Sequence, residues 1–218
     1  MKNVFSLIYS AAVGLLLLLF FIPHQAQSNR SNSTIMDTSR TLIDERDGQE
    51  YPLQQIGGLL WMAQNLNYAS PHSECYEGQD SLCLQYGRMY DYEESRNICP
   101  EHWRLPSPKD WKQLKKAVGS GSADRLVVPG VWEDEAFNGA NNALGMNILP
   151  GGRIDEHGSY AGPGRFGERG LSSSFWLAGD HLHWHIRWGK SQMHQHGKLA
   201  EQGRKFYVRC VCSVEDLD

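Results

Sequence analysis

The sequence predicts a mixed α+β domain with mainly antiparallel strands, two helices and a long loop region. Three observations support this prediction. A glycine pair separates two short apolar runs early in the chain, a capped amphipathic helix follows near the middle, and strand-like segments close the chain. Strands grouped at either end of a helical region, and not alternating with helices, favour α+β architecture.

The first predicted element is a β-hairpin. Residues 51–56 and 59–65 are two short runs on either side of Gly57-Gly58. Glycine readily adopts the positive φ that a two-residue hairpin turn requires. The segment that follows, residues 68–85, is polar and holds Cys75 and Cys83.

The clearest helix signal begins at Ser107, which suits the N-cap position. Pro108 takes the first helical position and Asp110 lies three residues after the cap. Apolar residues then recur at helical spacing as far as Val118, and Gly119 ends the helix.

The rest of the chain predicts weaker elements. A shorter helix is expected over residues 91–97, and the density of Gly, Asn and Pro over residues 130–170 predicts a long loop region. Three strands are expected over residues 173–178, 182–188 and 205–213.

The N-terminal segment predicts export. Lys2 precedes an apolar run over residues 7–22, which Pro23 closes, and this pattern is typical of a signal peptide, here residues 1–26. The run is shorter than the roughly 18 to 20 apolar residues that span a bilayer. Because His24 stands where a small residue is preferred, an uncleaved membrane anchor is the alternative. No cysteine follows the run, so we do not expect a lipoprotein.

Beyond the signal, composition divides the chain into three parts. Residues 27–43 are polar and predict a disordered tether, residues 44–213 form one domain, and residues 214–218 are a tail. The formal net charge of −4 gives no electrostatic footprint for nucleic acid. We expect a protein that is secreted or held at the cell surface, with a membrane contact only if the signal is uncleaved.

The chain has five cysteines, which in an exported protein indicate disulfides. We predict that Cys75 pairs with Cys83, closing a local loop, and that Cys99 pairs with Cys210, tying the first half to the last strand. Cys212 is then left over. It is a buried free thiol, an intermolecular bridge or the true partner of Cys99.

Six separated motifs carry a family resemblance. They are IGGLLWMAQNL at 56–66, GRMY at 87–90, CPEHWRLPS at 99–107, LPGGR at 149–153, FW at 175–176 and VRCV at 208–211. In this order and spacing they resemble the Fibrobacter succinogenes major paralogous domain, a family of exported bacterial proteins. The resemblance implies a C-type-lectin-like fold and no established activity. The RLPS segment is also similar to one in formylglycine-generating enzymes, which share that broad fold.

Four histidines are the candidate metal ligands. His183 and His185 share one face of a predicted strand, and His194 and His196 repeat that spacing beyond a possible hairpin around Gly189. Neutral imidazoles so placed are able to share a zinc or copper ion. We favour a solvated strand face instead, because no Asp, Glu or Cys is placed to complete a site, and we predict no cofactor.

The tryptophans divide into core and candidate platform. Trp61, Trp103, Trp111 and Trp176 lie in motif positions typical of core packing, whereas Trp132 lies in the loop region and is the candidate ligand platform. The sugar-binding strings of calcium-dependent lectins are absent, as are a nucleophile elbow, a P-loop and an HExxH motif.

These observations predict a non-catalytic binding or surface-structural domain, and not an enzyme. One alternative is a glycan- or cell-wall-binding module that uses the loops of residues 130–170. The other is a metal- or thiol-dependent enzyme, similar to formylglycine-generating enzymes, that uses the histidine cluster or Cys210 and Cys212. The expected partner is a glycan or another cell-surface component.

Overall fold

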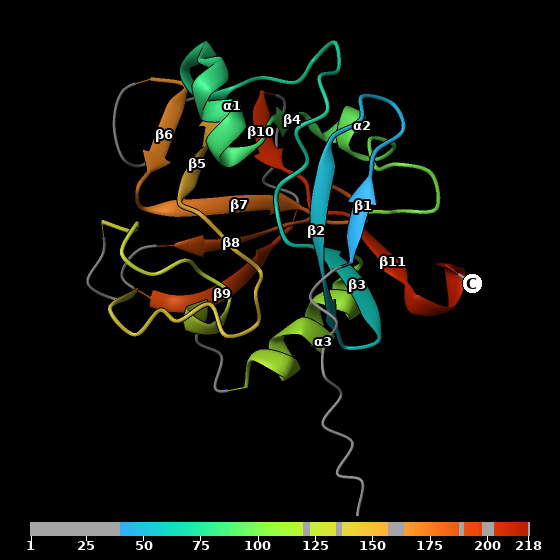
Figure 1. The fold of residues 1–218 in the computed structure, drawn as a ribbon. Coiled ribbons are helices and arrows are strands. Elements are labelled where there is room, and N and C mark those ends of the chain that lie inside the picture. Colours follow the sequence, from blue (N-terminus) through green and yellow to red (C-terminus); the bar gives the residue numbers. More distant parts are fainter. Residues whose placement is uncertain are drawn as a thin grey trace, which may run out of the picture. The chain divides into compact units, whose positions relative to one another are not determined.

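The computed structural model describes residues 40–119, 123–133, 137–156, 164–187, 190–197 and 203–217, which lie in one compact unit. The predicted signal peptide lies outside these residues. The described chain is α+β, as predicted, and its strands form two sheets (Figure 1). None of its helices has the length and apolar character needed to cross a membrane.

The smaller sheet joins the two ends of the domain. It contains β1 (Thr41–Ile43), β2 (Glu50–Ile56), β3 (Leu59–Met62) and β11 (Val211–Ser213), in that order and all antiparallel. The β2–β3 hairpin turns at Gly57 and Gly58, both at positive φ, which confirms the predicted hairpin. The predicted tether is wrong at residues 41–43, which form β1. This strand is held by its pairing with β2 and by Leu42, which packs against the core.

The larger sheet has seven strands. Its main path runs β4 (Met89–Tyr90), β10 (Arg204–Tyr207), β5 (Gly151–Asp155), β7 (Ser172–Trp176), β8 (His183–Arg187) and β9 (Lys190–His196), and β6 (Phe166–Arg169) pairs with β5. Most pairings are antiparallel, but β7 pairs parallel with both β5 and β10.

The helices are short. They are α1 (Asp80–Tyr86), α2 (Tyr92–Ser95) and α3 (Pro108–Val118), with 3₁₀ turns η1 (Tyr76–Gly78), η2 (Ala123–Arg125) and η4 (Val214–Leu217). The α3 N-terminus is a capping box: Ser107 Oγ accepts from the backbone N–H of Asp110, whose carboxylate accepts from Ser107 N across 2.7 Å. The sequence therefore predicted α3 correctly at both ends.

Three predictions about secondary structure were wrong in part. Two helices were predicted and α1 was not one of them, and β5 and β6 lie in the predicted loop region. The expected strand over residues 205–213 is divided between the sheets, since Tyr207 pairs with β7 whereas Val211 pairs with β3. Residues 206–212 are all buried through this crossing, and Arg209, the one charged residue among them, lies between the two strands.

The core has two clusters, which take alternate side chains from β7 and β10. Phe175 and Tyr207 belong to the cluster under α3, where the rings of Trp111 and Trp184 lie 3.9 Å apart. Trp176 and Phe206 belong to the second cluster. Trp61, Trp103, Trp111 and Trp176 are all buried, as their motif positions predicted.

Candidate functional site

A polar pocket lies beside the start of β2 and opens next to the end of α1. Its cavity volume is about 280 Å³. It is lined by Gln49, Glu50, Tyr51, Gln64, Asn65, Asn67, Cys83, Leu84, Gln85, Tyr86, Gly87, Val128, Asn147, Leu149 and Arg209. We call it the amide pocket, because six of these residues are Asn or Gln.

The two sides of the amide pocket approach closely at Gly87. Its φ is 82°, and a Cβ there would lie 2.7 Å from the Cβ of Asn65. Only glycine fits this contact without strain. The close approach lets Arg88 N donate to Leu66 O across 3.0 Å, and Asn65 Nδ2 donates to Tyr86 O across 2.7 Å. The end of α1 is thus fixed against the loop after β3.

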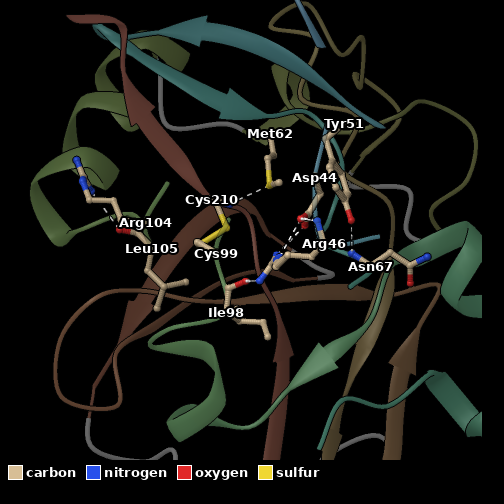
Figure 2. The surroundings of a disulfide bond; sticks show 10 residues. All are labelled: Asp44, Arg46, Tyr51, Met62, Asn67, Ile98, Cys99, Arg104, Leu105 and Cys210. Carbon is tan, nitrogen blue, oxygen red and sulfur yellow. Dashed lines mark hydrogen bonds and ion pairs between the residues drawn. A yellow bond between two sulfur atoms is a disulfide. The ribbon is translucent and has the colours of Figure 1, made fainter. Parts of the chain in front are cut away.

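Tyr51 and Asn67 give the amide pocket a donor and an acceptor. The Tyr51 hydroxyl accepts from Asn67 N across 3.0 Å (Figure 2), and within the described residues its own proton has no acceptor. Burial raises the pKa of Tyr51 to about 12, so the hydroxyl stays protonated. The side-chain oxygen of Asn67 is buried and has no hydrogen-bond partner. Both residues line the pocket, and each has hydrogen-bonding capacity that the described residues leave unused.

Arg209 is the cation of the amide pocket. It is 2 % exposed, and its Nε donates to Asn65 Oδ1 across 2.7 Å. Burial lowers the pKa of Arg209 to about 9, which still leaves it charged at neutral pH. The pocket therefore combines neutral amides with one buried positive charge.

The family assignment covers most of this structure. The model of the Fibrobacter succinogenes major domain matches residues 55–212, which include most of the pocket lining. The chain belongs to the Fibrobacter succinogenes major domain family. This confirms the resemblance carried by the six motifs. No curated protein and no solved structure matches the chain.

The sequence of this Fibrobacter succinogenes major domain did not predict the amide pocket. The lining residues come from segments as distant as Gln49 and Arg209, so no local spacing links them. One signal was present: the run Gln64-Asn65-Leu66-Asn67 puts three amides in four residues within and just after a family motif.

The candidate metal ligands do lie together in this Fibrobacter succinogenes major domain. On β8 and β9, His183 is opposite His196 and His185 is opposite His194. The rings of His185 and His196 stack with centroids 4.7 Å apart and planes 8° apart. In the described part of the chain, no group of three or more His, Cys, Asp or Glu side chains is arranged to hold a metal ion.

These histidines are buried more deeply than a solvated strand face implies. His183 is 5 % and His185 is 9 % exposed. Burial, reinforced by the nearby charge of His196, lowers the pKa of His183 to about 4 and that of His185 to about 3. Both rings are neutral at physiological pH. The expected solvated face is therefore wrong for β8, whereas His196 on β9 is exposed.

Trp132, the candidate ligand platform, is half-buried. Its ring packs against Phe137 with centroids 4.4 Å apart, and its Nε1 is buried without a hydrogen-bond partner. It also lies outside the amide pocket.

Both predicted disulfides are present. Cys75 pairs with Cys83 and Cys99 pairs with Cys210, the latter beside Met62 and Leu105 in Figure 2. Cys212 is a free, buried thiol, one of the three alternatives left open by the sequence. Burial raises the pKa of the Cys212 thiol, which keeps it protonated and a poor nucleophile.

A second, more open cleft lies near α2, lined in part by Arg96, Arg104 and His181. Each of these basic groups already has its own carboxylate. Arg96 pairs with Glu93, Arg104 pairs with Asp110, and His181 Nδ1 lies 2.9 Å from Asp180. Since its polar groups are satisfied locally, this cleft offers less to a ligand than the amide pocket.

Proposed function

We propose that this protein is an exported, non-catalytic binding domain that holds a saccharide in the amide pocket. The observation that carries the proposal is the pocket lining, which combines six amide side chains with the free hydroxyl proton of Tyr51 and the unpartnered oxygen of Asn67. Sugar hydroxyls are both donors and acceptors, and amides supply both kinds of partner.

The size and apolar part of the pocket suit the same ligand. Ligand pockets typically measure about 300–1,000 Å³, and the cavity of about 280 Å³ is near the lower end of that range. Such a space fits one sugar residue better than a folded oligosaccharide. Leu84, which is 83 % exposed, and Tyr86 provide apolar surface at the mouth for the C–H face of a sugar ring.

The proposed ligand is outside the cytoplasm, because the protein is expected to be exported. Two disulfides are typical of proteins in oxidising compartments. We also propose that the domain has a C-type-lectin-like fold. The pairing of strands from both ends of the domain in one sheet supports this.

The chemistry of the pocket favours binding over catalysis. Glycoside hydrolysis commonly uses two carboxylates on either side of the bond, and Glu50 is the single carboxylate in the pocket lining. A thiol mechanism through Cys210 and Cys212 is disfavoured, since Cys210 is in a disulfide and Cys212 is buried. Metal analysis of the purified protein tests the remaining rival class, and stoichiometric zinc or copper would overturn the non-catalytic assignment.

The binding proposal is tested on a glycan array with the exported protein. We expect Asn67→Ala and Tyr51→Phe to weaken the signal and Trp132→Ala to leave it unchanged, because Trp132 lies outside the pocket. Loss of signal in Trp132→Ala alone would move the site to the loops of residues 130–170. Silence of the folded wild-type protein across the array would contradict saccharide binding and favour a surface-structural role.

A further inference from the structure

Arg209 is almost fully buried, yet within the described chain it lacks the carboxylate partner that three less buried arginines have. Arg153 pairs with Glu168 across 3.1 Å, and Arg204 pairs with Asp155 across 2.9 Å. In the same way Arg46 pairs with Asp44 across 2.6 Å. Among the described residues, no carboxylate lies within ion-pair distance of Arg209, although Arg209 is the most deeply buried of the four.

The guanidinium of Arg209 is bonded to neutral oxygens. Besides Asn65 Oδ1, it donates from Nη1 to the carbonyls of Met62 and Met146, and from Nη2 to the carbonyl of Asn147 across 3.3 Å. These bonds position the group but leave its charge uncompensated. A buried charge without a counter-charge is costly, and a carboxylate that pairs with it recovers part of that cost.

One donor of Arg209 remains for a ligand. A guanidinium has five N–H groups, and the four hydrogen bonds above use Nε, both protons of Nη1 and one of Nη2. The fifth N–H is on Nη2, the nitrogen bonded to Asn147 O. Arg209 and Asn147 both line the amide pocket, so Nη2 is bonded to a residue of the pocket wall.

We propose that the amide pocket binds a saccharide that bears a carboxylate, such as a hexuronic acid unit, with the carboxylate on Arg209 Nη2 and the hydroxyls on the surrounding amides. This inference rests on the proposed saccharide-binding function and adds the chemical class of the ligand. A charge-assisted hydrogen bond of this kind is about twice as strong as a neutral one.

Glu50 also lines the pocket, but it does not cancel this preference. Its side chain is exposed, where water and salt screen its charge, whereas Arg209 is buried. A peptide C-terminus offers the same carboxylate as a uronic acid. We favour the sugar because six amides match a dense set of hydroxyls better than they match the apolar side chains of a peptide.

The charge of the ligand is tested with matched ligands. Oligosaccharides of glucuronic, galacturonic and mannuronic acid are titrated into the full-length protein by calorimetry at about 150 mM salt. Each is compared with its methyl ester, which keeps the sugar skeleton and removes the charge. We expect at least one acid to bind about tenfold or more tightly than its ester, as the loss of a charge-assisted hydrogen bond predicts.

The position of the charge is tested with Asn147→Asp. The aspartate keeps an oxygen to accept the 2.6 Å hydrogen bond from Asn142 Nδ2, and aspartate tolerates the φ of 49° at this position. It adds a negative charge next to Arg209, so uronate binding should fall about tenfold or more, and by a clearly larger factor than binding of the ester, which loses at most a contact to one amide. The matched control is Asn141→Asp, on the same loop but outside the pocket.

Each outcome separates the two proposals. Preference for the acid that Asn147→Asp abolishes and Asn141→Asp retains supports the inference. Equal binding of acid and ester, or an acid preference that Asn147→Asp leaves intact, overturns the inference and leaves saccharide binding in place. Binding of carboxyl-terminal peptides without binding of any saccharide overturns both proposals.

Discussion

Arg209 Nε and Asn65 Oδ1 are joined by a 2.7 Å hydrogen bond in the protein interior, across 144 residues of chain. The bond connects the segment between β10 and β11 to the loop after β3. Asn65 also holds the end of α1 through Tyr86 O. One amide therefore links three parts of the fold that line the amide pocket.

Asn65→Leu should destabilise the protein. It removes the acceptor of a buried guanidinium N–H and the donor to a backbone carbonyl, and unpaired buried polar groups cost about 1–3 kcal/mol each. We expect the free energy of unfolding to fall by about 2–4 kcal/mol in urea denaturation. Gln64→Leu, at an exposed neighbour, should change it by less than about 0.5 kcal/mol. Equal stability of the two variants would show that the Asn65 bonds do not matter.

The two disulfides should contribute unequally. Cys99–Cys210 spans 111 residues and Cys75–Cys83 spans 8. Loop-closure entropy gives upper values of about 5 and about 2.5 kcal/mol respectively. We therefore expect the Cys99→Ala/Cys210→Ala double variant to unfold at a lower denaturant concentration than Cys75→Ala/Cys83→Ala. The opposite order would mean that local strain or residual structure outweighs the entropy of the unfolded chain.

Cys212 should be unreactive in the folded protein. Its thiol is buried, and burial raises its pKa, so little thiolate is present at neutral pH. A thiol reagent should label no cysteine in native protein and one per chain in guanidinium without reductant. Peptide mapping should place the label on Cys212. A label on Cys210 would instead indicate a Cys99–Cys212 disulfide, and a disulfide-linked dimer would indicate an intermolecular bridge.

The sequence predicted those parts of the fold that depend on local signals. The Gly57-Gly58 turn and the Ser107 capping box each act within a few residues, and the structure contains both. Helix α1 was missed because its sequence is polar, with Leu84 left facing solvent. The division of the last strand was missed because burial continues from Phe206 to Cys212 while the partner sheet changes.

The candidate site was harder to predict than the fold. The amide pocket stands out because its buried arginine has no carboxylate partner in the described part of the chain. A sequence does not show which arginine and carboxylate will form an ion pair. Arg153 and Arg209 both lie in family motifs, yet the first pairs with Glu168 and the second has only neutral partners. The prediction for the histidines was correct in part. The two pairs lie opposite each other on β8 and β9 as expected, but the burial of the β8 pair was not predicted.

The protein should become less stable as pH falls, because His183 and His185 are buried in their neutral form. Burial lowers their pKa values to about 4 and about 3, below the value of about 6.5 expected in the unfolded chain. His196, Arg153 and Arg204 lie close enough to add unfavourable positive charge. Because the unfolded state takes up the protons first, this stability is complete above about pH 6.5 and is lost as pH falls towards about 4.

The loss of stability per pH unit should be largest between pH 6 and 5. Each histidine contributes up to about 1.4 kcal/mol per pH unit there. In urea unfolding, His185→Gln should therefore lose less stability than wild type between pH 7 and 5, whereas His72→Gln, at an exposed position, should follow wild type. Asp44, Glu74 and Asp110, whose pKa values are lowered, weaken the fold only at lower pH and are common to all three proteins. If His185→Gln and wild type lose the same stability over this interval, the ring of His185 is not held neutral by burial.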